Sequence, residues 1–236
     1  NWQQILNIEA LKSEKRNISY LTVDAIKLLL SQPDTVTIKG RRDLALLALM
    51  YDTGARVQEI ADLIPDRVRI ESRPYTIRLT GKGGKSRIVP LMDEQVDLLL
   101  GYMQEHHLDI PQNKLHPLFF NNRREKLTRG GITFILHMYV DMARTANPEI
   151  IPKTVSCHSL RHSKAMHLLQ TGVNLIYIRD ILGHQSIQTT DIYARSDSKQ
   201  KREALEKAYV DVIPENNGEN QWEKDKNLLD WLQSLR

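Results

Sequence analysis

Apolar residues recur every three or four positions along most of the chain, and this spacing predicts helices. The first predicted helix is capped by Thr22 or Asp24 and runs to Leu30, shortly before Pro33. The segment 119–122, Phe-Phe-Asn-Asn, is predicted as a turn. Further helices are predicted at 41–51, 57–63, 93–105, 131–146, 159–170, 175–182, 187–194 and 198–210.

The pattern changes after Pro65, where three short runs carry strand-forming residues. These runs cover 68–70, 75–79 and 87–90, and the last two flank the glycine-rich segment 81–85. A glycine-rich connection of this length is typical of a hairpin. The sequence therefore predicts an α+β fold, mostly α with a small three-stranded antiparallel sheet.

Polar residues dominate again at 214–221, which is predicted as a linker. Beyond it, the segment 222–235 is predicted to form an amphipathic helix whose apolar residues cover about half of its circumference. A helix of this kind needs a partner surface, either on its own domain or on a neighbouring copy. Its apolar residues are Leu228, Leu229, Trp231, Leu232 and Leu235.

The composition is that of an ordinary globular chain of 236 residues, with 41% hydrophobic and 26% charged residues, and it can form a sizeable core. The single Cys excludes an internal disulfide framework and a Cys-rich zinc site, and it fits a reducing compartment. No apolar run approaches the length of a membrane span, and the first ten residues lack a signal-peptide pattern. These features predict a cytoplasmic protein without a membrane partner.

Positive charge is concentrated in one part of the chain. The net charge is +4, and residues 39–87 hold 11 basic against 6 acidic side chains. Such a segment is a candidate surface for a polyanion, and a solvated charged face is the alternative interpretation.

An arginine follows a small-residue turn in Thr53-Gly54-Ala55-Arg56 and opens a helix. A guanidinium at this position lies near backbone N–H groups that favour anions, so it can bind a phosphate with two hydrogen bonds. A surface ion pair between Arg56 and Glu59 is the simpler structural interpretation. The motif alone leaves both open.

The hairpin segment 81–87, Gly-Lys-Gly-Gly-Lys-Ser-Arg, does not match a nucleotide-triphosphate loop, since it joins strands instead of opening a helix. Its tip can carry the Lys82 ammonium into a groove, where that group can donate a proton to a leaving oxygen. A plain basic surface hairpin is the alternative.

Histidines cluster in Cys-His-Ser-Leu-Arg-His at 157–162. His158 and His162 stand four residues apart and can share a metal ion, but the sequence shows neither a third ligand nor the glutamate of a zinc protease. His158 and Arg161 share one helix face and can both reach one phosphate.

The last candidate is Leu-Gly-His at 182–184, followed nine residues later by Tyr193. A lone tyrosine on a helix usually lies in a core or an interface. Only about one free tyrosine in a thousand is ionised at pH 7, so a nucleophilic Tyr193 needs a base and cations nearby.

Taken in order, these segments resemble the catalytic domain of the tyrosine recombinases, also called the phage integrase family. The resemblance runs from Ile18 to Tyr209 and implies the tyrosine recombinase catalytic-domain fold. It rests on five motifs in the family's order, namely T-G-A-R-V-Q-E-I, the G-K-G-G-K hairpin with R-I-V-P-L, H-S-L-R-H, L-G-H and T-T-D-I-Y.

The resemblance implies roles for the charged candidates. Arg56 and Arg161 match two arginines that hold the non-bridging oxygens of the scissile phosphate and stabilise the pentacoordinate transition state. Lys82 matches a lysine that protonates the departing 5′ oxygen. Glu59 matches an acidic position that supports the site.

The same resemblance implies roles for the remaining candidates. His158 matches a proton acceptor, and His184 matches a hydrogen-bond donor to phosphate. Tyr193 matches the nucleophile, which forms a 3′-phosphotyrosyl link to DNA. Two guanidiniums and an ammonium can replace metal ions on a phosphodiester, so we expect no cofactor, metal ion or ATP.

The resemblance also implies an organisation for the chain. Residues 1–17 match the end of an interdomain linker, with the upstream core-binding domain absent, and 18–213 match the catalytic domain. Residues 214–236 match a linker and a C-terminal helix that docks in trans, which predicts self-association into a synaptic tetramer. The expected partner is double-stranded DNA at a recombination site.

The predicted function is site-specific DNA recombination or integration, for a mobile element in the bacterial cytoplasm or nucleoid. Two alternatives stay open: a catalytically inactive DNA-binding architectural protein, and a nicking and closing enzyme similar to type IB topoisomerases. A metal-dependent hydrolase lacks support, because the histidine segment provides neither a base nor a full ligand set.

Overall fold

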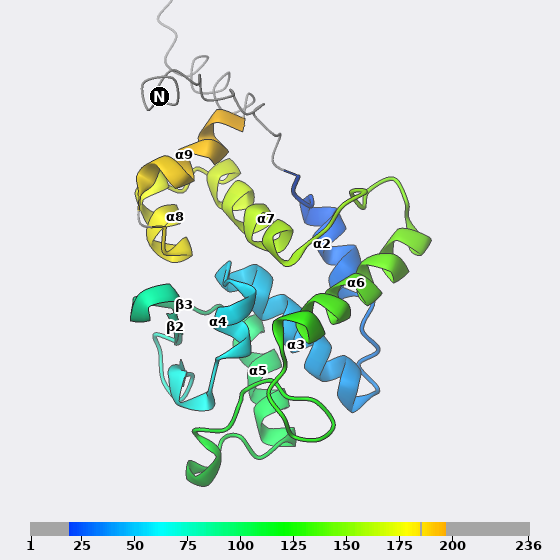
Figure 1. Ribbon diagram of the computed structural model, residues 1–236, viewed down its shortest axis with the longest axis vertical. Coiled ribbons are helices and arrows are strands. Elements are labelled where there is room, and N and C mark those ends of the chain that lie inside the picture. The colour runs from blue at the N-terminus through cyan, green and yellow to red at the C-terminus, as the bar shows by residue number, and fades with distance from the viewer. Residues whose placement is uncertain (1–18, 185, 197–236) are drawn as a thin grey trace, which may run out of the picture. The chain divides into compact units, whose positions relative to one another are not determined.

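Helices make up most of the described chain, in agreement with the apolar spacing (Figure 1). The structure is a computed structural model that describes residues 19–184 and 186–196. Its α-helices are α2 (Val23–Leu30), α3 (Ile38–Thr53), α4 (Val57–Ala61), α5 (Asp93–Glu105), α6 (Arg129–Ala146), α7 (Cys157–Gln170), α8 (Leu175–Leu182) and α9 (Ile187–Ser196). Its strands are β1 (Val68–Arg69), β2 (Thr76–Thr80) and β3 (Ser86–Pro90), and short 3-10 turns are η1 (Pro65–Arg67), η2 (Lys82–Gly84) and η3 (Pro111–Asn113).

Side-chain caps explain where the first helices begin. Thr22 caps α2, because its hydroxyl accepts a hydrogen bond from the Ala25 backbone N–H. Thr37 caps α3 in the same way, through the Gly40 N–H. This cap starts α3 three residues before the predicted position 41.

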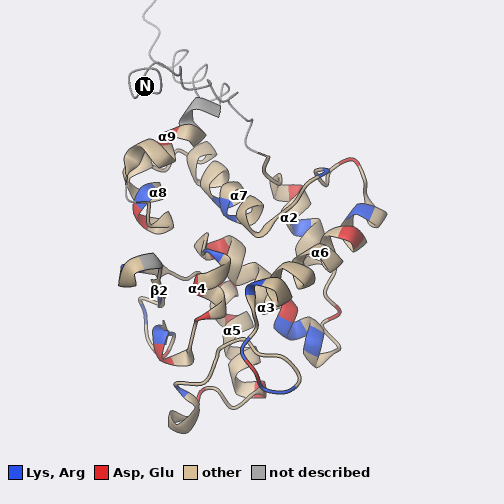
Figure 2. Ribbon diagram, viewed as in Figure 1, with Lys and Arg blue, Asp and Glu red and all other residues tan. Residues whose placement is uncertain are grey.

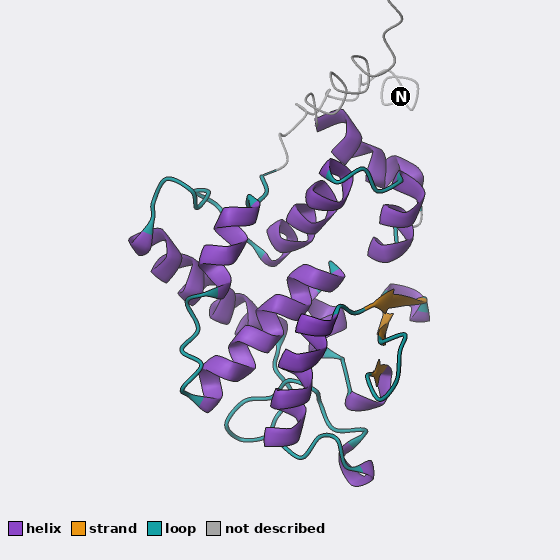
Figure 3. Cartoon of the chain, turned by 180° about the vertical axis from the view of Figure 1, so that it is seen from behind, coloured by secondary structure: helices purple, strands orange, loops and turns teal. Residues whose placement is uncertain are grey.

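The three strands form one antiparallel sheet, as predicted, and their order is β1-β2-β3. Figure 3 shows these strands together on one side of the helices. In β2 and β3, Ile77 lies opposite Val89 and Leu79 lies opposite Arg87. Opposite residues of an antiparallel pair share one face of the sheet, so Arg87 shares the face of three buried apolar residues.

Two groups of buried apolar residues hold the helices together. The larger group surrounds α3, where Leu46, Leu49 and Met50 are fully buried. The smaller group joins α7, α8 and α9, and it contains Met166, Ile178, Leu182 and Tyr193. Tyr193 is therefore part of a core in this conformation.

The basic segment 39–87 is only partly a surface. Arg42 and Arg87 have side chains that are 10% exposed, and each pairs with a buried carboxylate. Basic and acidic positions are interspersed over several elements of the described chain (Figure 2). Two of the eleven basic residues counted in this segment are therefore taken up by internal ion pairs and do not add to a candidate surface for a polyanion.

Several sequence predictions fall on other parts of the chain. Four predicted segments lie outside the described residues, namely the linker end at 1–17, the helix at 198–210, the linker at 214–221 and the helix at 222–235.

The turn predicted at 119–122 begins later than expected. Phe119 and Phe120 are buried, and the turn lies just after them, where the Asn121 N–H bonds to the Glu125 carbonyl. Within the described ranges, no helix combines the length and the apolar character that a membrane span requires.

Candidate active site

Arg56 and Glu59 meet at the start of α4. The Arg56 backbone N–H donates to Glu59 Oε2 at 2.7 Å, and the Arg56 guanidinium donates to Oε1 at 2.9 Å. Glu59 is 3% exposed, whereas the Arg56 side chain is 40% exposed. The buried carboxylate thus anchors an arginine whose outer side reaches solvent.

Arg87 binds the same carboxylate from β3. Its two terminal nitrogens donate to the two oxygens of Glu59, each at 2.8 Å. Burial by itself would raise the pKa of Glu59, but the hydrogen bonds and charges of Arg87 and Arg56 outweigh it and lower the pKa to about 2. Glu59 is therefore ionised and shared between two arginines.

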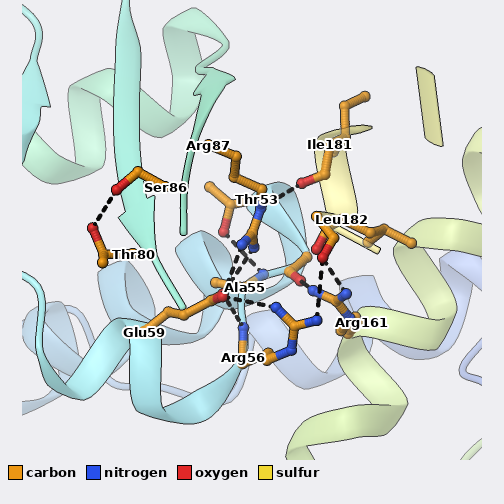
Figure 4. Close-up of polar contacts among 12 residues, drawn as sticks. Thr53, Ala55, Arg56, Glu59, Thr80, Ser86, Arg87, Arg161, Ile181 and Leu182 are labelled. Carbon is orange, nitrogen blue, oxygen red and sulfur yellow. Dashed lines mark hydrogen bonds and ion pairs between the residues drawn. The ribbon is translucent and has the colours of Figure 1, made fainter. Parts of the chain in front are cut away.

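The C-terminal end of α8 brings three arginines together (Figure 4). The last carbonyls of a helix lack intrahelical partners and carry a partial negative charge, so they attract cations. Arginines from three different elements donate to three successive carbonyls. The pairs are Arg87 Nε with Ile181 at 2.7 Å, Arg161 with Leu182 at 2.7 Å and Arg56 with Gly183 at 3.3 Å.

Arg161 is the most enclosed of the three arginines, at 4% exposure. It also donates to the Gly54 carbonyl at 2.6 Å, so it links the end of α3 to the end of α8. Burial, together with the charges of Arg56 and Arg87, lowers the pKa of Arg161 to about 10. The guanidinium is still protonated at neutral pH.

A cleft of about 720 Å³ opens beside these arginines. The hairpin borders one side of it, and the end of α8 with the following turn borders the other. Its lining residues are Arg56, Gly81, Lys85, Ser86, Arg87, Gly183, His184 and Thr189. A phosphate in this cleft would meet at least two cationic side chains.

His184 lies at this cleft, where its Nδ1 is 2.9 Å from the Thr190 hydroxyl. Burial and the nearby charges of Arg161, Arg56 and Arg87 lower the pKa of His184 to about 4. The ring is therefore neutral at pH 7, with one N–H to donate.

Tyr193 is covered in this conformation, at 1% exposure. Its hydroxyl is 2.8 Å from His162 Nδ1, and its ring stacks on His184 with the ring centres 6.4 Å apart. Burial raises the pKa of Tyr193, and the positive charge of Arg161 opposes this rise. The phenol thus lies next to two histidines, His162 and His184, and close enough to Arg161 for that positive charge to act on its pKa.

His158 lies on the first turn of α7 and is exposed. Its ring centre is 6.4 Å from that of His162, and both rings line a second cleft of about 600 Å³ with Arg144 and Lys153. Lys82 begins the 3-10 turn of the hairpin, and only its backbone is described.

The structure thus brings Arg56, Glu59, Arg161 and His184 together at the end of α8. Tyr193 does not line the cleft beside the arginines. It contacts His184, which lines that cleft, and His162, which lines the second cleft. No group of three or more His, Cys, Asp or Glu side chains in 19–184 and 186–196 is arranged to hold a metal ion.

The sequence patterns gave Arg87 no role, and they indicated His162 only as a candidate metal ligand. Arg87 had a detectable signal, because strand alternation places it on the face of Val89 while Ile88 points outward at 61% exposure. The contacts of His162 and Thr190 had no such signal, since each depends on how α7, α8 and α9 pack.

Acid should destabilise the chain through Glu59. An ordinary glutamate has a pKa of 4.5 and the folded chain holds Glu59 at about 2, so the unfolded chain binds more protons between these values. The free energy of unfolding should fall by on the order of 3 kcal/mol as the pH drops from 4.5 to 2, at about 1.4 kcal/mol per pKa unit. Urea unfolding at a series of pH values measures this slope.

Glu59→Gln should have a smaller slope over the same pH range, because the glutamine side chain does not titrate. Glu94→Gln, which changes an exposed residue of α5, is the control and should keep the wild-type slope. Equal slopes for all three chains would contradict the assignment of the low pKa to Glu59.

Comparison with known proteins gives relatives of one kind. The family model described as "Phage integrase family" matches residues 19–200. "Tyrosine recombinase XerD" of Staphylococcus epidermidis is 37% identical over 196 residues, which cover 83% of this chain and 64% of the relative. The chain therefore spans a little under two thirds of the length of this relative.

Solved structures match over similar parts of the chain. The XerH site-specific recombinase in a post-cleavage complex with its palindromic difH substrate has a TM-score of 0.69 and 26% identity, over 83% of this chain and 55% of that chain. The catalytic domain of bacteriophage HP1 integrase has a TM-score of 0.54 and 25% identity, over 80% of this chain and 94% of that domain. The described fold thus corresponds to a catalytic domain within longer proteins.

Proposed function

Because the chain belongs to the phage integrase family, we propose that it is the catalytic part of a tyrosine recombinase that cleaves and rejoins duplex DNA through a 3′-phosphotyrosyl link at Tyr193. One observation carries this proposal. Arg56 and Arg161, far apart in the sequence, donate to adjacent carbonyls at the end of α8. Two guanidiniums held so close can bind one phosphate together.

In the proposed cleavage step, the Tyr193 oxygen attacks the phosphorus and the bond to the 5′ oxygen breaks. Arg56 and Arg161 bind the non-bridging oxygens, whose negative charge grows in the transition state. The phenol proton passes to His158, and Lys82 gives a proton to the departing 5′ oxygen. A 5′ hydroxyl from another strand then reverses the step, so joining needs no ATP.

His184 is proposed as a neutral hydrogen-bond donor to the phosphate. If the Thr190 hydroxyl donates to Nδ1, the ring proton lies on Nε2, which is then free to donate. The low pKa of about 4 supports a neutral ring throughout the physiological range.

Tyr193 must leave its covered position before it can attack. Its hydroxyl bonds to His162 and its ring lies in the core of α7, α8 and α9. We therefore propose that α9 shifts when DNA and neighbouring subunits bind, and that the phenol then enters the cleft beside Arg56.

The partners are proposed from the relatives. XerH was solved with its DNA substrate, and this supports a duplex recombination site as the ligand here. We propose a synaptic tetramer linked by the segment 222–235 and a role in a mobile element. A nicking and closing enzyme would share the cleavage chemistry but would not exchange strands between two duplexes, and an inactive DNA-binding protein would form no covalent product.

A covalent-adduct assay tests the proposed function. Nicked duplexes that tile the DNA on both sides of the gene serve as probes, because a short fragment released at the nick cannot rejoin and the covalent product accumulates. We expect an SDS-stable adduct, with the nucleotide attached to the peptide that contains Tyr193, and the same yield in the presence of EDTA. An adduct on another residue, or one that EDTA removes, would refute the mechanism.

DNA binding should depend strongly on salt, because phosphate contacts dominate nucleic-acid affinity. If about six phosphates are neutralised, the affinity should fall on the order of 10³-fold between 50 and 200 mM salt. Fluorescence anisotropy with a labelled duplex measures this dependence. A flat response would argue against a duplex held along a cationic surface.

A further inference from the structure

Arg87 is a largely covered arginine that joins the parts of the candidate site, although the family resemblance gives it no catalytic role. It extends from β3 on the face shared with Val89 and Leu79, and its side chain is 10% exposed. Its three polar contacts reach two other elements. They are both oxygens of Glu59 on α4 and the Ile181 carbonyl on α8.

Glycine at position 183 allows this close approach. Gly183 ends α8 in the left-handed conformation, with φ 66°. A Cβ atom there would lie 2.8 Å from Arg87 Cδ, so the Arg87 side chain would have to shift to admit any other residue. The stem of Arg87 therefore packs directly against the turn whose carbonyl receives Arg56.

The charges explain why a second arginine on Glu59 matters. Glu59 Oε1 accepts from Arg56 and from Arg87. With Arg87 present, one carboxylate is shared by two guanidiniums, and positive charge is left over at the cleft. Without Arg87, Glu59 would pair with Arg56 alone, cancel its charge and hold it away from a phosphate.

We propose that Arg87 is a positioning residue for DNA cleavage, which keeps Glu59 from neutralising Arg56 and holds the hairpin strand against the end of α8. This inference rests on the proposed function, because it assigns Arg56 to the scissile phosphate. Arg87 acts through Glu59, Arg56 and the α8 turn and need not touch the DNA itself.

The test compares Arg87→Gln with the wild-type chain in the adduct assay, at saturating probe and in single turnover. We expect the rate constant for adduct formation to fall by about 10- to 100-fold, since small displacements of a positioned group cost up to about 10²-fold. The dissociation constant for the probe should change by less than about threefold, because the Arg87 nitrogens already bond to Glu59 and the Ile181 carbonyl, and one contact contributes little to a phosphate-dominated affinity. Arg87→Lys keeps the positive charge but loses the paired hydrogen bonds from two nitrogens to the two Glu59 oxygens. This variant should give an intermediate rate.

Arg42→Gln is a matched control for the loss of an arginine with an equally covered side chain. The Arg42 side chain is also 10% exposed, pairs with the buried Asp43 and donates to the Phe120 carbonyl. Urea unfolding of both variants shows whether they lose similar stability. We expect Arg42→Gln to keep the wild-type cleavage rate, so a rate loss of equal size in both variants would overturn the specific role of Arg87.

A double variant separates the charge effect from simple damage to the structure. Glu59→Gln combined with Arg87→Gln removes the carboxylate that would otherwise neutralise Arg56, while the glutamine oxygen can still accept from the Arg56 N–H. We expect the double variant to cleave faster than Arg87→Gln alone. A double variant that is slower, or equally slow, would overturn the proposal.

Failure of this inference can be told from failure of the proposed function. If the wild-type chain forms no adduct at Tyr193, the proposed function and the role of Arg87 both fall. If the wild-type chain forms that adduct and Arg87→Gln forms it at the same rate, only the role of Arg87 falls.

Discussion

Replacing Tyr193 by Phe should abolish the SDS-stable DNA adduct and leave the fold intact. Phenylalanine keeps the ring among Met166, Ile178 and Leu182 but has no oxygen to attack phosphorus. The variant loses the hydrogen bond to His162, which should lower the free energy of unfolding by about 1 kcal/mol. Denaturing gels that resolve free protein from the DNA adduct measure the first effect, and urea unfolding measures the second.

Tyr102→Phe is the matched control for this change. Tyr102 is 2% exposed and its hydroxyl donates to the Leu118 carbonyl at 2.8 Å, so the same oxygen is removed from a buried ring elsewhere. We expect a similar loss of stability and full adduct formation. Persistence of the adduct in the Tyr193 variant would show that another residue is the nucleophile.

Arg161→Lys should lower the cleavage rate by about 10²- to 10³-fold, the usual effect of removing one preorganised donor from a developing negative charge. Lysine keeps the positive charge, but its single ammonium cannot hold both the Gly54 and the Leu182 carbonyls and also bind a phosphate. Single-turnover adduct formation measures the rate, and anisotropy measures the affinity for the same duplex.

The affinity should change far less than the rate, because Arg161 is one of several phosphate contacts in the proposed complex. Arg42→Lys is the control, because Arg42 is another buried arginine that donates to a backbone carbonyl. This variant should keep the wild-type rate. If Arg161→Lys cleaved as fast as the wild-type chain, the guanidinium would have no special part in the transition state.

Periodicity predicted the position of each described α-helix and strand, though not all of their bounds, because these elements bury regular apolar faces. The predicted helix at 93–105 has the observed bounds of α5. The start of α3 was misplaced, because one hydroxyl, that of Thr37, extends the helix past the apolar pattern. The sheet and its hairpin were recognisable because glycines interrupt a strand pattern.

The sequence identified the site residues only through the resemblance of its motifs to those of a known family. Nothing in the spacing of Arg56 and Arg161 shows that they share the end of α8, since that contact requires α3, α7 and α8 to pack first. Burial of Tyr193 agrees with the expectation for a lone tyrosine on a helix, but the residues that bury it could not be predicted, because they come from three helices. The inward position of Arg87 could have been predicted from the strand alternation.

The covered phenol has a consequence for any duplex that the chain meets by chance. Removing a large ring from a core costs about 1.5 to 3 kcal/mol, so an isolated chain should expose the Tyr193 hydroxyl only about one time in ten to one in a hundred or less. With Tyr193 as the proposed nucleophile, random encounters with the genome would then seldom lead to strand breaks. Protection against stray nicking would thus come from the resting conformation itself.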